Sequence, residues 1–230
     1  MIGRERIPTG APRGFFLTLE GIEGTGKSTH ARYLAESLRE LGYTVVVSRE
    51  PGGTPLGEVL RGLLLGVDGE CPVPRAELFL LLASRAQHVA GRILPDLNAG
   101  KIVICDRFGD ASLAYQGGGR GLGVEAVAAC NDLATGGLKP DRTLLLDITV
   151  DEAQRRVARR RRKEGSLDRL DMESEAFYRR VRDTYHRLAA AAPDRFRILE
   201  TTREKKALAA EVLTLVRPWA AERRDAGGLV

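Results

Sequence analysis

The fold of this chain is decided by Gly21-Ile22-Glu23-Gly24-Thr25-Gly26-Lys27-Ser28. This stretch fits the pattern G-x-x-x-x-G-K-[ST], a glycine-rich loop whose backbone N–H groups surround a phosphate. An apolar run at residues 15–19 precedes it and predicts a buried strand. Apolar residues at helical spacing follow it, from Ala31 to Leu41, until Gly42 closes the helix. Strand, loop and helix N-terminus is the context that the pattern requires, so the stretch predicts a site for a nucleoside triphosphate.

The residues of this loop have different expected roles. We expect Lys27 to reach the β- and γ-phosphates of ATP, and to face solvent when no nucleotide is bound, and we expect the Ser28 hydroxyl to bind Mg²⁺. A glycine-rich turn without a ligand is the alternative, and the matching strand and helix argue against it. ATP and Mg²⁺ are therefore the predicted cofactors. The predicted nucleotide-binding residues are Gly21, Ile22, Glu23, Gly24, Thr25, Gly26, Lys27, Ser28 and Thr29.

The composition favours one domain in the cytoplasm. With 230 residues, 43% of them hydrophobic, the chain can bury a substantial core. No apolar run approaches the ~20 residues that span a bilayer, so we expect no membrane partner. Residues 1–14 lack the apolar centre of a secretory signal and are expected to form a loose N-terminal extension. The odd set Cys71, Cys105 and Cys130 lacks metal-ligand spacing and is typical of reduced thiols in a cytoplasmic protein.

Apolar strand candidates alternate with helical segments, which predicts an α/β fold with a parallel sheet covered on both faces. Such sheets bind ligands outside the carboxyl ends of their strands. The predicted strands are residues 15–19, 44–48, 101–105, 143–148 and 195–199. After the first helix, the predicted helices span about 76–98, 124–134, 174–191 and 204–216, and a frayed tail is expected from Ala220.

Charged residues follow two of the predicted strands. Asp106 ends an apolar run, where P-loop proteins place an acid associated with magnesium, so Ser28 and Asp106 are the predicted metal ligands. Arg107 beside it offers a planar fork that suits a phosphate. The second strand is followed by Arg49-Glu50-Pro51-Gly52-Gly53-Thr54, which taken alone is equally well a surface turn. Arg85 lies in an apolar helix, where a lone arginine usually reaches the surface.

A basic run, residues 155–163, contributes to a net charge of +5 and a pI near 9.3. Taken alone it is typical of a solvated helix face or of an RNA-binding patch. Because it follows the fourth predicted strand of a phosphate-binding sheet, it could also be a lid whose arginines close over a phosphoryl group. The arginines of the chain lie in separate motifs rather than along one stripe, so we expect phosphates in a pocket, and no nucleic acid, as their partners.

Several motifs occur together in the order seen in thymidylate kinases, and the chain resembles this family from about residue 15 to about residue 216. The motifs are the P-loop, Arg49-Glu50-Pro51-Gly52-Gly53-Thr54, Ser84-Arg85-Ala86-Gln87, Asp106-Arg107-Phe108, Ala114-Tyr115-Gln116-Gly117-Gly118-Gly119-Arg120-Gly121, Gly137-Leu138-Lys139-Pro140-Asp141 and Leu167-Asp168-Arg169-Leu170. The P-loop is shared by many enzymes. The pairing of Arg-Glu-Pro-Gly-Gly-Thr with Asp-Arg-Phe and Ala-Tyr-Gln at these spacings is far more specific.

The resemblance implies a P-loop nucleoside-monophosphate-kinase fold, with a five-stranded parallel sheet flanked by helices and a short mobile lid. It places a kinase domain at residues 15–218, the lid at about 159–170 and a C-terminal tail at 219–230. It also implies a homodimer that forms through helices. The implied reaction is ATP + dTMP → ADP + dTDP, in which dTMP is the small-molecule partner.

The resemblance implies roles for individual residues. Glu23 is expected near the sugar 3′-hydroxyl and the metal, and Arg49 and Arg107 on the acceptor phosphate. Arg85 is expected on the base, and Tyr115 where a 2′-hydroxyl would project. The predicted substrate-binding residues are Glu23, Arg49, Leu81, Arg85, Arg107, Ser112, Tyr115 and Gln116.

Members of the family differ in where they keep the catalytic arginine, and the chain is similar to those that keep it in the lid. Its P-loop has no arginine, whereas the basic run is dense in arginine. The predicted catalytic residues are Lys27, Arg107, Arg160, Arg162 and Glu23.

Three positions depart from the family pattern. Leu81 replaces the aromatic residue that usually stacks on thymine. Ala111, which is followed by Ser112, replaces the usual serine after the Asp-Arg-Phe motif, and Asp171 replaces the usual glutamate of the lid. The first departure bears on the affinity for the base.

The implied acceptor is a phosphate with a second pKa near ~6, so its oxygen is ionised at neutral pH and needs no general base. Catalysis then consists of positioning and charge stabilisation. The alternatives are a kinase for another nucleoside monophosphate, a deoxynucleoside kinase with Glu23 or Asp106 as base, and a nucleic-acid-binding P-loop ATPase that uses the basic run. Arg49 and Arg107 together argue for a charged acceptor.

Overall fold

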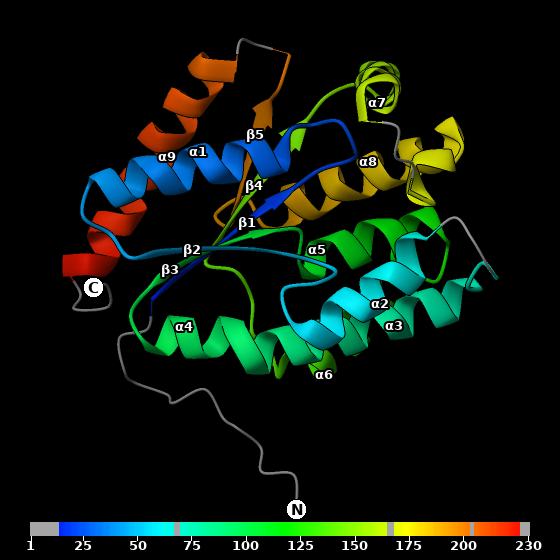
Figure 1. Ribbon diagram of the computed structural model, residues 1–230, viewed down its shortest axis with the longest axis horizontal. Helices are drawn as coiled ribbons and strands as arrows, with labels where there is room; N and C mark the ends of the chain where they lie inside the picture. The colour runs from blue at the N-terminus through cyan, green and yellow to red at the C-terminus, as the bar shows by residue number, and fades with distance from the viewer. Residues whose placement is uncertain (1–13, 67–69, 165–167, 203–204, 226–230) are drawn as a thin grey trace, which may run out of the picture.

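Five parallel strands form the centre of the part of the chain that the computed structural model describes, residues 14–66, 70–164, 168–202 and 205–225 (Figure 1). The strands are β1 (Phe15–Glu20), β2 (Val45–Arg49), β3 (Ile102–Asp106), β4 (Arg142–Asp147) and β5 (Phe196–Glu200). Their order is β2-β3-β1-β4-β5, so β1 pairs with β3 on one side and with β4 on the other. The predicted five-stranded parallel sheet is confirmed.

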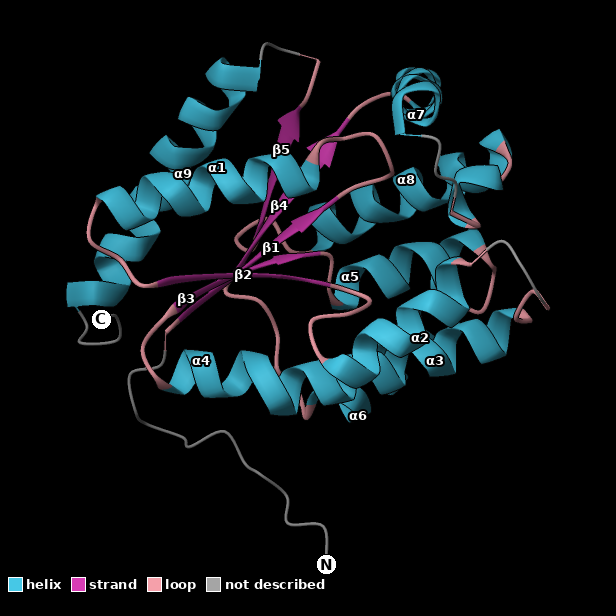
Figure 2. Ribbon diagram, in the orientation of Figure 1, coloured by secondary structure: helices cyan, strands magenta, loops and turns pink. Residues whose placement is uncertain are grey.

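Helices cover both faces of the sheet (Figure 2). The α-helices are α1 (Lys27–Glu40), α2 (Pro55–Leu65), α3 (Pro74–His88), α4 (Leu94–Asn98), α5 (Gly109–Ser112), α6 (Val124–Thr135), α7 (Val150–Glu164), α8 (Glu175–Ala191) and α9 (Lys205–Asp225). Shorter turns are the π-helical η1 (Val89–Ile93) and η2 (Leu113–Gly119) and the 3₁₀ turn η3 (Leu170–Met172). None of the helices in the described ranges is long and apolar enough to cross a membrane.

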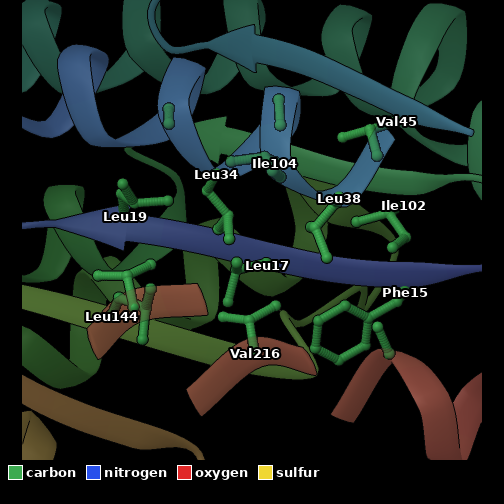
Figure 3. Packing of buried hydrophobic residues seen from close by; sticks show 14 of the residues in the cluster. Phe15, Leu17, Leu19, Leu34, Leu38, Val45, Ile102, Ile104, Leu144 and Val216 are labelled. Carbon is green, nitrogen blue, oxygen red and sulfur yellow. The ribbon is translucent and has the colours of Figure 1, made fainter. Parts of the chain in front are cut away.

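Alternation along β1 explains the two layers, because successive side chains of a strand point to opposite faces. Phe15, Leu17 and Leu19 are buried on the face covered by α1 and α9, in one cluster with Val216 (Figure 3). Phe16 points to the other face, where it packs with residues of η1 and α4. Since both faces of the sheet are covered, the strands are continuous apolar runs, which is why the sequence reveals them.

The long helix predicted at about 76–98 is a continuous helical stretch of three segments, α3, η1 and α4. Pro95 lies in the first turn of α4 and has no N–H to donate to the turn before it. The chain at that turn, η1, is π-helical. The proline therefore explains why the stretch is not one regular α-helix.

The last helix is longer than predicted. We expected it to end near Val216 and the tail to be frayed from Ala220, but α9 continues through Pro218 to Asp225, so this prediction was wrong. Val216 and Ala220 are fully buried in the core cluster on that face of the sheet. Packing of these two side chains against the sheet outweighs the hydrogen bond that is lost at the proline. Residues 1–13 of the predicted N-terminal extension lie outside the described residues.

Candidate active site

The P-loop begins where β1 ends, and its glycines determine its course. Gly21, Gly24 and Gly26 have φ angles of 135°, 77° and 87°, which glycine adopts without strain. A Cβ on Gly24 would lie 2.8 Å from the carbonyl oxygen of Ala153 in α7. Gly26 is the N-cap of α1, and the Thr29 N–H donates to its carbonyl oxygen at 3.1 Å. The positive end of the helix dipole therefore lies at the loop, which suits an anion.

Lys27 is the first residue of α1, and its ammonium group is turned into the loop. Nζ donates to the carbonyl oxygens of Gly21, at 3.1 Å, and of Ile22, at 2.8 Å, and the residue is 7% exposed. Thr25 Oγ1 closes the same turn by donating to the Ile22 carbonyl at 2.9 Å. Our prediction of a solvent-facing lysine was therefore wrong, because the loop itself offers acceptors to the ammonium. Burial, and repulsion from Arg107, lower the pKa of Lys27 to about 8.

Ser28 and Asp106, the predicted metal ligands, meet at the carboxyl edge of the sheet. The Ser28 hydroxyl donates to Asp106 Oδ2 at 2.5 Å. Both residues line an open cavity of about 590 Å³, which we call the Ser28 cavity, and Arg49 lies in the same lining. A hydroxyl and a carboxylate that converge beside a P-loop are hard oxygen ligands of the kind that Mg²⁺ prefers, so these residues fit this metal.

A smaller cavity of about 100 Å³, which we call the Arg85 cavity, contains most of the predicted substrate-binding residues. Its lining includes Glu23, Leu81, Arg85, Arg107, Ser112, Tyr115 and Gln116. These residues come from the P-loop, α3, the end of β3, α5 and η2, which are distant in the sequence. Arg49 lies apart from them, because it lines the Ser28 cavity and is paired with Glu58 at 2.8 Å.

Arg85 is 2% exposed, and the protein itself uses most of its donors. Nε donates to Glu50 at 2.7 Å, and Nη1 donates to Ser112 at 2.9 Å. Nη1 also donates to Asn131 at 2.5 Å, and Nη2 donates to the Phe108 carbonyl at 3.0 Å. With these partners among the described residues, one of the five N–H donors of an arginine, on Nη2, is available to a ligand in the cavity. The side chain is buried rather than at the surface because the carboxylate compensates its charge.

Arg107, Glu23 and Tyr115 form a bonded group between the P-loop and the Arg85 cavity. Arg107 Nη2 donates to Glu23 at 2.6 Å, and the Tyr115 hydroxyl donates to the other oxygen of that carboxylate at 2.5 Å. Arg107 has a φ of 69°, in the left-handed region, and its Nη1 donates to the Gly21 carbonyl at 2.9 Å. Burial alone would raise the pKa of Glu23, but Arg107 and Lys27 outweigh it and lower this pKa below its usual value. Glu23 is therefore a carboxylate at neutral pH.

α7 contains the two predicted lid arginines, and they lie in different surroundings. Arg160 Nη2 donates to both carboxylate oxygens of Asp171, each at 2.9 Å. Arg162 is exposed on the same helix. Residues 165–167 of the predicted lid lie outside the described residues. The function of either arginine in the reaction stays a prediction.

Three charged residues of the Arg85 cavity were missed by the sequence reasoning. Arg61, Asp168 and Glu50 also line it. Burial, and repulsion from Arg49, lower the pKa of Arg61. No motif marks an arginine on an amphipathic helix such as α2, so no local pattern pointed to Arg61. Glu50, in contrast, lies inside a motif and could have been found as the counter-charge of Arg85.

Comparison with known proteins decides between the remaining interpretations. A family model described as thymidylate kinase matches residues 19–212. The chain belongs to the thymidylate kinase family. It is 47% identical over 203 residues to the thymidylate kinase of Pseudomonas putida (strain GB-1), which covers 88% of this chain and 95% of that protein. It is 46% identical over 211 residues to the thymidylate kinase of Bordetella pertussis (strain Tohama I), with 92% and 98% covered.

A crystal structure of thymidylate kinase from Ehrlichia chaffeensis is also similar, with a TM-score of 0.71 and 35% sequence identity. The match covers 89% of this chain and 98% of that chain. Both the resemblance and the fold class that the sequence predicts are therefore confirmed. The chain is a nucleoside-monophosphate kinase that phosphorylates dTMP, and the alternatives considered from the sequence are not favoured.

Proposed function

We propose that the Ser28 cavity holds ATP, that the Arg85 cavity holds dTMP, and that the phosphoryl group passes between them beside Arg107. The position of Arg107 is the observation that carries this proposal. Its guanidinium donates to Gly21 and Glu23 of the P-loop and also lines the Arg85 cavity. A cation at this junction can hold an acceptor phosphate while it faces the donor phosphates.

The chemistry asks for charge stabilisation rather than for a base. The acceptor phosphate has a second pKa near ~6, so its attacking oxygen is ionised at neutral pH. Lys27 would leave the loop carbonyl groups and neutralise the donor phosphates, since a phosphate is a stronger acceptor than a carbonyl. Arg107 would hold the acceptor phosphate in line, while Glu23 keeps that arginine in place.

Mg²⁺ belongs to this proposal, and Ser28 and Asp106 would hold it. Their oxygens already converge at the P-loop, at 2.5 Å from one another. Bound there, the ion would supply positive charge to the donor phosphates. Arg49 lines the same cavity and is half exposed, so it can turn from Glu58 toward a phosphate of either nucleotide.

Recognition of the base is proposed for the inner end of the Arg85 cavity. Arg85 offers one N–H of Nη2, and Ser112 and Gln116 offer further polar groups in the same lining. Leu81 would give the base apolar contact, and the buried Tyr115 would fill the space that a 2′-hydroxyl requires. The cavity would then favour a deoxynucleotide with a small planar base.

For the lid, we propose that Arg160 or Arg162 stabilises the transferring group. Arg160 is anchored to Asp171, whereas Arg162 is exposed. The arginine that acts in the transition state should lower kcat on removal far more than it raises either KM. Equal losses of kcat in the two single variants, of a size that depends on the salt concentration, would instead support a diffuse electrostatic effect.

We also propose that the enzyme is a homodimer that forms through α2, α3 and α6. These helices lie together in Figure 1, and α3 contacts both of the others. Leu56, Val59 and Leu63 recur on one exposed face of α2, and Phe79 of α3 and Leu133 of α6 are 62% and 86% exposed. Apolar side chains gathered on neighbouring helices are typical of an interface. Light scattering should give a dimer for the wild type and a monomer for Val59→Glu.

A cytoplasmic location completes the proposal, and the odd number of thiols supports it. The central test is coupled ADP release with dTMP, dUMP, CMP, UMP, AMP and GMP, and dTMP should give the highest kcat/KM. Arg107→Met should weaken dTMP binding by about tenfold to a hundredfold and leave the KM for ATP nearly unchanged. A higher kcat/KM with another monophosphate, or ATP turnover that depends on nucleic acid and on salt, would overturn the assignment.

A further inference from the structure

Glu77 of α3 is a buried carboxylate that the chemistry above does not use. It is 1% exposed and accepts hydrogen bonds from three side chains. Gln116 Nε2 donates at 2.7 Å, Arg120 donates through Nε at 3.2 Å and Nη2 at 3.0 Å, and Arg169 donates through Nη2. Burial alone would raise the pKa of Glu77, but the donors from Arg120, Gln116 and Arg169 outweigh it and lower this pKa. Glu77 is therefore a buried charge that holds three elements together.

Two of these contacts lead to the segment between α7 and α8, residues 168–173, which we call the return segment (Figure 1). At its start, the Arg169 backbone N–H donates to the Leu65 carbonyl at 3.0 Å, and Nε donates to the Leu64 carbonyl at 3.0 Å. At its end, Glu173 pairs with Arg120 at 2.6 Å. Both ends of the return segment are thus tied to α2, α3 and η2 through one network.

The return segment also forms part of the active site. Asp168 and Leu170 line the Arg85 cavity, and Asp171 holds Arg160 of α7. On the other side of the network, Gln116 lines the same cavity while it donates to Glu77. The buried carboxylate therefore joins two walls of the cavity that come from distant parts of the sequence.

We propose that Glu77 is a positioning residue of the acceptor site: with Arg120, Arg169 and Glu173 it forms a clasp that holds the return segment against the Arg85 cavity. This rests on the proposed assignment of that cavity to dTMP. Without the clasp, the cavity wall formed by Asp168 and Leu170 of the return segment is free to move away, and dTMP binding then has to order it again. The Ser28 cavity shares no residue with the clasp, so the donor site should not respond.

The test compares Glu77→Gln, Arg169→Met and the double variant with Glu36→Gln, a charge-matched control on the exposed face of α1. Steady-state kinetics should show the KM for dTMP raised about tenfold to a hundredfold in each clasp variant, with the KM for ATP changed less than about twofold. The KM for dTMP of the double variant should be no higher than that of the more impaired single variant, because the two residues act as one unit. Glu36→Gln should match the wild type.

A readout without substrate separates the clasp from the assignment of the cavity. Hydrogen exchange of the return segment, including the Arg169 amide bonded to Leu65, should be faster in Glu77→Gln than in the wild type and in Glu36→Gln. If the wild type failed to phosphorylate dTMP, the proposed function would fall while this readout still decided the clasp. Unchanged exchange, or an unchanged KM for dTMP, overturns the proposal.

The same experiments also test for a merely structural role. Loss of thermal stability with equal rises in both KM values would show that Glu77 only supports the fold, and additive effects in the double variant would show that the residues act separately. If Glu77→Gln does not fold, Arg169→Met and Arg120→Met decide the question alone, since both side chains are partly exposed, at 12% and 15%. Either variant with a normal KM for dTMP then overturns the clasp.

Discussion

Replacing Arg85 by methionine tests the buried charge pair under the Arg85 cavity. Arg85 and Glu50 are 2% and 4% exposed, and Nε lies 2.7 Å from the Glu50 carboxylate. Arg85→Met removes the cation and leaves the carboxylate almost fully buried. We expect the folded state to lose stability, because an uncompensated buried charge is unfavourable. The proposed dTMP site should be lost as well, since Arg85 lines that cavity.

The size of the effect follows from the partners that remain. Removal of one partner from a buried pair costs about 3–5 kcal/mol. His88 Nδ1 keeps its contact with the other oxygen of Glu50, at 3.0 Å, so we expect the lower end, about 3 kcal/mol. In a chain of this length each kcal/mol moves the midpoint of thermal unfolding by about 2–4 °C, which gives a fall of about 6–12 °C. A second change, Glu50→Gln, neutralises the buried charge and should recover about half of the loss.

Thermal unfolding followed by circular dichroism, without nucleotides and at neutral pH, gives these midpoints. Arg92→Met is the matched control, because Arg92 is 54% exposed in its pair with Asp96 at 3.2 Å. A surface pair at i, i+4 contributes about 0.3–0.5 kcal/mol, so the control should shift the midpoint by less than about 2 °C. If the unfolding midpoint of Arg85→Met falls as little as that of Arg92→Met, Glu50 is not an uncompensated buried charge in the variant. The same follows if the double variant is less stable than Arg85→Met.

Three further changes test other parts of the site. Lys27→Met should abolish phosphoryl transfer, because it removes the cation that neutralises the donor phosphates. It should not lower the unfolding midpoint, because the ammonium that it removes is buried and desolvated. Near-normal turnover would exclude Lys27 from the donor site. Leu81→Phe should lower the KM for dTMP about twofold to tenfold and leave the KM for ATP unchanged, since stacking of an aromatic pair adds roughly 0.5–1.5 kcal/mol. An unchanged KM for dTMP would show that thymine does not lie against this residue. Burial, and repulsion from Asp110, raise the pKa of Glu20 from 4.5 to about 8, so its contribution to stability is present below its unfolded pKa and is lost as the pH rises through about 8. In urea titrations the free energy of unfolding of Glu20→Gln relative to wild type should therefore be higher at about pH 8.5 than at about pH 5.5, and a difference that is independent of pH would contradict this.

The sheet, the P-loop and the residues that follow the strands could all be predicted from the sequence. The P-loop is a local structure, because its glycines, its strand and its helix are consecutive. The apolar runs determine the strands, because both faces of the sheet are covered. Asp106 and Arg107 could be placed beside the P-loop without a structure, since the carboxyl ends of parallel strands meet at one edge.

The partners of the charged side chains, in contrast, depend on the tertiary structure. The sequence shows Arg85 and Glu50 as members of separate motifs, whereas the fold buries them as a pair. The fold likewise turns the Lys27 ammonium inward, against our prediction, and pairs Glu77 with Arg169 of the return segment. Burial and the choice of counter-charge depend on elements that are far apart in the chain, so no local pattern reports them. The end of α9 could not be predicted for the same reason, because apolar contact with the sheet determines it rather than Pro218.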